Sequence, residues 1–163
     1  MDTQEKRDRT AKGLASLTKY LADNPHVPVP NLIYTYVNET TPVIGHLSRY
    51  SYEAEIDYRE NETDESRRDR QNHVLKEWIG SVARQLIGTG VKIEKIYEGT
   101  TFKLKVTGAN FVINYTTTRE AVCRRVVKET KEIPEQYIPG RIEPARKEEV
   151  VEWVCDDGTV LNK

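Results

Sequence analysis

The stretch HVLKEWIGSVARQLIGTG, residues 73–90, decides the fold because it carries the clearest secondary-structure signal in the chain. Its apolar residues recur every three or four positions, which predicts a helix with one broad apolar face. Thr63 and Asp64 lie where a side chain would cap the start of this helix, and Gly88 lies where a left-handed residue would end it. The apolar face consists of Val74, Leu75, Trp78, Ile79, Val82, Ala83, Leu86 and Ile87.

Strand patterns lie on both sides of this helix. After it, residues 91–97, 101–106 and 111–115 are rich in β-branched and aromatic side chains and are separated by glycine-containing turns. Before it, residues 32–37 have the same character, and residues 50–59 alternate apolar with mainly acidic side chains, as a half-buried antiparallel strand does. This order predicts an α+β fold with an antiparallel sheet of about five strands.

A first helix is predicted over residues 4–22, where apolar side chains again recur at three- and four-residue spacings. Pro25 ends it, because proline disfavours the helical conformation in the residue before it. Pro28 and Pro30 then keep the next residues extended. We expect the sheet to be covered by these two helices.

The C-terminal part of the chain has a different character. Residues 122–133 and 149–155 have the composition of strands. The segment 133–144 between them contains three prolines and one glycine, which indicates a loop. Two strands flanking such a loop predict a β-hairpin arm over residues 119–163, following a core of residues 1–118.

Composition limits the classes of protein that fit. Apolar residues make up 37% of the chain, against a usual share of about 45–50%, and 31% of the residues are charged, so the core is modest. No stretch approaches the length of a membrane span, and residues 1–7 lead into no hydrophobic signal region, so we expect a cytoplasmic protein without membrane contact. The net charge of −1 argues against a globally basic nucleic-acid binder.

Cys123 and Cys155 lie near the base of the predicted arm. Their spacing fits neither a C-x-x-C redox pair nor a zinc site. The favoured interpretation is two reduced thiols that pack as small apolar residues. A disulfide is an alternative, although the chain carries no export signal. A catalytic thiol is a further alternative, although no histidine is near in sequence.

The remaining chemically active side chains form no catalytic or metal-binding motif. His26, His46 and His73 are isolated from one another, which favours satisfied or solvated imidazoles over ligands or general bases. Residues 53–65 hold seven acids and one base, which we interpret as a solvated sheet face because a straight strand does not converge oxygens on a cation. The tyrosines within residues 50–58 fit core packing better than a base-stacking platform. No cofactor is expected.

Three segments carry a resemblance to known proteins. They are LADNPHVPVP at residues 21–30, REAVCRRVV at residues 119–127 and VEWVC at residues 151–155. On these segments the chain resembles an uncharacterised family of small proteins from actinobacteria and from their phages and prophages. The tip PGRIEP, residues 139–144, departs from the family's forms. The resemblance implies a cytoplasmic accessory protein of a phage or mobile element, and it transfers no functional residue.

The leading hypothesis is a non-enzymatic protein that binds a host or self protein through residues 124–154. The absence of a catalytic set and the apolar and aromatic residues in an extension both favour this hypothesis. Homo-oligomerisation through the arm stays open. The residues expected to contact the partner are Arg124, Arg125, Lys128, Tyr137, Ile138, Arg141, Ile142 and Trp153.

The alternative hypothesis is nucleic-acid binding. It would use Arg67, Arg68 and Arg70 at the start of the second helix together with the lysines and arginines of the arm. In the arm these cations interleave with glutamates, a pattern more typical of cross-strand charge pairing than of a phosphate-binding track. An enzyme that uses Cys123 or Cys155 ranks third.

Overall fold

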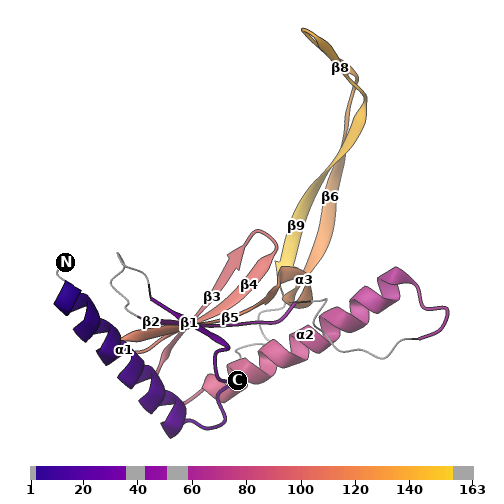
Figure 1. The fold of residues 1–163 in the computed structure, drawn as a ribbon. Coiled ribbons are helices and arrows are strands. Elements are labelled where there is room, and N and C mark those ends of the chain that lie inside the picture. The colour runs from indigo at the N-terminus through magenta and orange to yellow at the C-terminus, as the bar shows by residue number, and fades with distance from the viewer. Residues whose placement is uncertain (1–2, 36–42, 51–58, 156–163) are drawn as a thin grey trace. The chain divides into compact units, whose positions relative to one another are not determined.

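The computed structural model describes residues 3–35, 43–50 and 59–155. These residues form two compact units, of which the first ends at Val122 and the second begins at Cys123. The first unit holds the helices and a five-stranded sheet, and the second holds two β-hairpins (Figure 1). The fold class is therefore α+β, as predicted.

Two long helices form where the sequence predicts them. They are α1 (Thr3–Asp23) and α2 (Asp64–Leu86), and a short third helix, α3 (Arg119–Val122), ends the first unit. The side chain of Thr63 accepts a hydrogen bond from the backbone N–H of Ser66 and so caps α2. Gly88 follows α2 with a φ of 80°, the left-handed conformation expected of a helix-ending glycine.

The sheet has the strand order β1-β2-β5-β4-β3. It pairs antiparallel at every step except one, since β2 runs parallel to β5. The sheet therefore differs from the predicted all-antiparallel arrangement in one pairing. The five strands are β1 (Leu32–Tyr34), β2 (Val43–Ser48), β3 (Lys92–Glu98), β4 (Thr101–Thr107) and β5 (Phe111–Thr118).

Strand β2 is the element that the sequence patterns did not predict. The predicted strand at residues 50–59 cannot be compared along most of its length, because residues 51–58 lie outside the described residues. Residues 50 and 59 at its ends do not belong to a strand. Strand β2 begins with Val43 and Ile44, which are both buried. These two apolar residues are too few to show the alternation of apolar and polar side chains by which strands are recognised.

The core of the first unit contains residues from the sheet and from both long helices. On β4, Phe102, Leu104 and Val106 alternate with less buried residues and are almost completely buried. Helix α1 reaches this core through Tyr20, whose ring centroid lies 5.1 Å from that of Phe111 at the start of β5. Helix α2 contributes Leu75, Ile79, Val82, Ala83 and Leu86, which are all buried.

The second unit, residues 123–155, holds the predicted hairpin, and we call it the arm. Strands β6 (Cys123–Ile133) and β9 (Arg146–Cys155) pair antiparallel and form its ribbon. The segment predicted as a loop instead forms a second hairpin, which we call the tip, from β7 (Gln136–Ile138) and β8 (Arg141–Glu143). Strands form here because the three prolines flank β7 and β8 rather than interrupt them.

Candidate functional site

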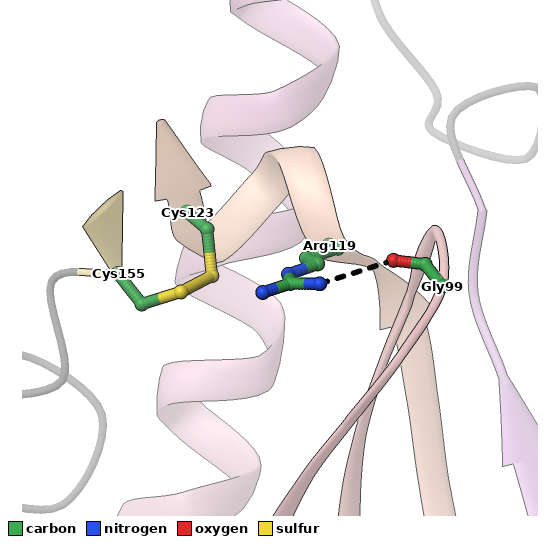
Figure 2. Close-up of a disulfide and its surroundings, with 4 residues drawn as sticks. All are labelled: Gly99, Arg119, Cys123 and Cys155. Carbon is green, nitrogen blue, oxygen red and sulfur yellow. Dashed lines mark hydrogen bonds between the residues drawn. A yellow bond between two sulfur atoms is a disulfide. The ribbon is translucent and has the colours of Figure 1, made fainter. Parts of the chain in front are cut away.

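A disulfide closes the base of the arm. Cys123 and Cys155 are directly opposite each other as the first pair of the β6–β9 ladder, and their sulfur atoms are bonded (Figure 2). The favoured prediction of two reduced thiols is therefore wrong, and the disulfide alternative is the one that the structure shows. Neither cysteine is a free thiol, which also removes a catalytic thiol from this state of the protein. The signal in the sequence was the hairpin register itself, which places the two cysteines as cross-strand neighbours.

Each face of the ribbon carries apolar side chains beside a cation. Because side chains alternate along a strand, the cross-strand pairs Arg125–Trp153 and Val127–Val151 share one face with the disulfide. The other face carries the pair Arg124–Val154. Val127, Val150 and Val154 are all exposed in the protein. A ribbon of only two strands has no interior in which such residues could be buried.

The charges of the ribbon are largely neutralised within the arm. Arg125 forms an ion pair with Glu149 at 2.9 Å, and Lys147 lies 3.7 Å from Glu132. Lys128, which occupies a β-bulge and has no partner in the ladder, reaches across to the carboxylate of Glu152. Seven lysines or arginines and seven glutamates lie between the two cysteines. The arm therefore offers no continuous positive track.

The tip presents the most exposed large apolar side chains of the arm. Tyr137 is 78% exposed and its cross-strand partner Ile142 is 62% exposed. Ile138 is also exposed and lies opposite Arg141, whose guanidinium pairs with Glu143 at 2.6 Å. Gly140 makes the turn with a φ of 95°, a conformation that favours glycine. The tip is therefore a small apolar surface with little net charge.

A hollow of about 470 Å³ lies where the ribbon meets the tip. Ile133, Pro134 and Ala145 supply apolar walls, so an apolar side chain fits it better than an ion does. Sequence reasoning missed this feature, because its walls come from the ends of two strands separated by the tip. The hollow is lined by Glu132, Ile133, Pro134, Ala145, Arg146 and Lys147.

The predicted contact residues fall into two groups at opposite ends of the ribbon. Arg124, Arg125 and Trp153 lie close to the disulfide, with Lys128 further along β6. The other group is in the tip hairpin and consists of Tyr137, Ile138, Arg141 and Ile142. The structure does not bring the eight residues together into a single cluster. Of the two groups, the one in the tip is the more apolar and the more exposed.

The arginines at the start of α2 are also engaged with carboxylates. Arg70 contacts both carboxylate oxygens of Glu62, each at 2.6 Å. Arg67 lies 3.5 Å from Asp64. Two of the three arginines proposed to bind nucleic acid are therefore already paired with acidic residues. The Arg70 contact holds the pKa of Glu62 below its usual value, mainly through the hydrogen bond.

The three histidines lie in separate environments. The imidazole of His26 lies 3.0 Å from the backbone carbonyl of Gln85, and His73 is exposed on α2. His46 on β2 is hydrogen-bonded to the hydroxyl of Ser48. Burial, and secondarily the charge of Lys103, lowers the pKa of His46. Within the described residues, no three His, Cys, Asp or Glu side chains converge as a metal site requires.

In the part of the chain that the structure describes, no helix has the length and apolar character needed to cross a bilayer. No protein-family model, curated protein or solved structure matches the chain.

Proposed function

We propose that this protein is a non-enzymatic accessory protein that binds a host or self protein through its arm. The observation that carries the proposal is the cross-strand pair Tyr137–Ile142, which the tip holds 78% and 62% exposed. Large side chains on an exposed hairpin add nothing to a core, and aromatic residues of this kind are the usual anchors of protein interfaces. The sequence resemblance supports a phage or mobile-element protein that acts on a host or self protein.

The charge pattern of the arm favours a protein partner over a nucleic acid. A phosphate backbone is bound by lysines and arginines whose charges are available to it. In the ribbon, Arg125, Lys128 and Lys147 are paired with glutamates, and the arm is electrically balanced. An electroneutral surface with apolar anchors suits the rim and core of a protein interface.

The hollow beside the tip gives the proposed interface a recess. Its apolar walls are flanked by Arg146 and by the ion pair Lys147–Glu132. An apolar side chain of the partner that enters this recess would place its neighbours beside Arg146. The proposed interface therefore consists of the two exposed anchors of the tip and the recess next to them.

A matched pair of variants tests the proposal. Ile142→Ser removes an apolar side chain that is 62% exposed on the tip, and Val29→Ser removes one that is 64% exposed in the first unit. Tagged wild-type and variant proteins are incubated with an actinobacterial lysate, with and without nuclease treatment, and are then cross-linked and recovered. We expect one dominant protein with the wild type and with Val29→Ser, and at least about a tenfold lower recovery with Ile142→Ser, the usual cost of an interface hot spot.

Two outcomes would contradict the proposal, and a third would identify the partner. Equal recovery with both variants would place the contact outside the tip. Recovery that disappears on nuclease treatment, with an affinity that falls steeply as salt is raised, would support the nucleic-acid alternative. Recovery of the protein itself as the only species, with a doubled mass in light scattering, would identify the partner as a second copy of this chain.

A further inference from the structure

We infer that the disulfide acts as a redox switch, which orders the arm when formed and releases it when reduced. This inference rests on the proposed function, because it concerns the regulation of the same surface. Its structural basis is the position of Cys123 and Cys155, which form the first ladder pair and enclose the whole arm between them. Apart from the backbone that runs through the tip, no other covalent link joins the two strands of the ribbon, since both cysteines of the chain are used in this one bond.

The noncovalent contacts of the ribbon are weak by comparison. An isolated two-stranded hairpin is marginally stable in water, because it lacks a buried face. Along β9 every residue from Arg146 to Val150 is exposed, and most of β6 is exposed as well. The cross-strand ion pairs join side chains that are about half exposed, and pairs of that kind contribute little. The bulge at Lys128 interrupts the ladder near its middle.

The disulfide therefore makes the largest single contribution to the order of the arm. A cross-link restricts the unfolded segment, and its effect grows with the number of residues that it encloses. Here the two cysteines are 32 residues apart. For a loop of that size, the cross-link shifts the folding equilibrium by roughly 100- to 1000-fold. Without it, the Tyr137–Ile142 pair has no stable ribbon to hold it in place.

The first unit is stabilised by a buried core of its own. Its buried core contains Leu17, Leu75 and Phe102, and both cysteines belong to the second unit. Reduction is therefore expected to loosen residues 124–154 and to leave the sheet of the first unit intact. This separation makes the arm suitable as a regulated element.

The reduction needs a dithiol, and it balances as follows. A thiolate of the reductant attacks the sulfur of Cys155, the less buried of the two cysteines, and Cys123 leaves as a thiolate. The second thiol of the reductant then closes its own disulfide and displaces Cys155. Two electrons pass to the protein, both cysteines take up protons, and the reductant is oxidised. Disulfides in cytosolic proteins are usually transient and redox-sensing, which agrees with the predicted cytoplasmic location.

The switch is tested first without a partner. Hydrogen exchange is measured on the full chain before and after reduction with dithiothreitol, and on the double variant Cys123→Ser/Cys155→Ser. Alkylation of the released thiols establishes that the native protein is reduced. We expect protection of the amides of β6 and β9 to fall by roughly 100- to 1000-fold on reduction. Protection in β4 should stay unchanged, and the double variant should match the reduced protein under both conditions.

Each other outcome of this experiment overturns the inference. A disulfide that dithiothreitol does not reduce in the folded protein cannot act as a switch. Unchanged protection in β6 and β9 would show that the ribbon is stable by itself. Loss of protection in β4 as well would show that the disulfide stabilises the whole chain rather than the arm.

A second measurement separates this inference from the proposed function. Partner recovery is compared between the oxidised and the reduced protein. Loosening of the arm with at least a tenfold loss of recovery supports the switch, and loosening with unchanged recovery overturns it as a regulator of binding. If neither form recovers a partner, the proposed function fails, and with it the regulatory role, whereas the exchange data still decide whether the disulfide orders the arm.

Discussion

The phenol of Tyr115 donates a hydrogen bond to the backbone carbonyl of Pro28 at a distance of 2.8 Å. This bond joins the middle of β5 to the extended segment that follows α1, 87 residues earlier in the chain. Tyr115 is completely buried, and burial raises the pKa of its hydroxyl. The hydroxyl therefore keeps its proton and remains a donor well into the alkaline range.

Replacing Tyr115 by phenylalanine should destabilise the protein by about 1 kcal/mol, because one hydrogen bond is lost while the ring is kept. Urea unfolding at neutral pH measures this loss, and Tyr137→Phe is the matched control, since Tyr137 is exposed. The raised pKa adds a second signature. Above about pH 10 the unfolded tyrosine ionises while the folded one does not, so the wild type should lose stability that Tyr115→Phe retains. Parallel curves for the two proteins above that pH would contradict the assignment.

Replacing Gly45 or Gly80 by alanine should change the stability of the protein in opposite directions. A Cβ atom on Gly45 would lie 2.6 Å from Cγ of Pro30, so Gly45→Ala should cost about 1–3 kcal/mol. Gly80 lies inside α2, where a Cβ atom would meet only the flexible end of Arg84 at 3.4 Å. Gly80→Ala should therefore stabilise the protein by about 0.5–1 kcal/mol. Thermal unfolding of the two variants should bracket the wild type, and the same sign for both would refute this interpretation.

The contact between Glu62 and Arg70 predicts a pH dependence of stability. The pKa of Glu62 is lowered in the folded protein, so its stabilisation is complete above the ordinary carboxyl value of about 4.3 and is lost as the pH falls below it. The free energy of unfolding of Glu62→Gln should lie below that of the wild type at pH 7, and the gap should close in acid. Glu60→Gln removes the same charge two residues away and should follow the wild-type curve. A gap that persists unchanged at low pH would rule out the ion pair as its cause.

Removing the tip should leave the first unit folded. Replacing residues 134–144 by an Asn-Gly turn shortens the arm and keeps both cysteines, since the deleted segment contributes no residue to the buried core. We expect the melting temperature of the first unit to stay within a few degrees of the wild-type value, as measured by the ellipticity of its helices. A collapse in that temperature would show that the tip stabilises the rest of the chain.

The helices and the strands after α2 were predictable because local signals determine them. The apolar spacing of Leu75, Ile79 and Leu86 and the cap at Thr63 locate α2 without knowledge of its neighbours. The alternation of Phe102, Leu104 and Val106 does the same for β4. Each of these patterns repeats over enough residues to fix both the type of element and the face that it buries.

The remaining features depend on contacts between distant segments. The parallel pairing of β2 with β5 brings Val43 opposite Phe111. The sequence of neither strand indicates which strand it pairs with. The disulfide could be predicted only from the hairpin register, which places Cys123 and Cys155 opposite each other. The lack of an export signal favoured reduced thiols instead. The strands of the tip were not predicted, because the proline content of the segment indicated a loop. Composition alone does not show that these prolines lie outside the paired positions of β7 and β8. The apolar hollow forms only when the ends of β6 and β9 come together.

The bulge at Lys128 has a consequence for how this arm can change in length. At the bulge, β6 contains one residue more than β9 between paired positions. Before the bulge the odd-numbered residues of β6, such as 123, 125 and 127, lie on one face of the ribbon. Beyond it the even-numbered residues 130 and 132 lie on that same face. Removing Lys128 alone would place Val127 and Glu129 next to each other opposite Val151 and Val150, which restores regular alternation and keeps each remaining residue on its face. The bulge therefore absorbs the extra residue locally, so the length of β6 can change by this one residue without exchanging the faces of the arm.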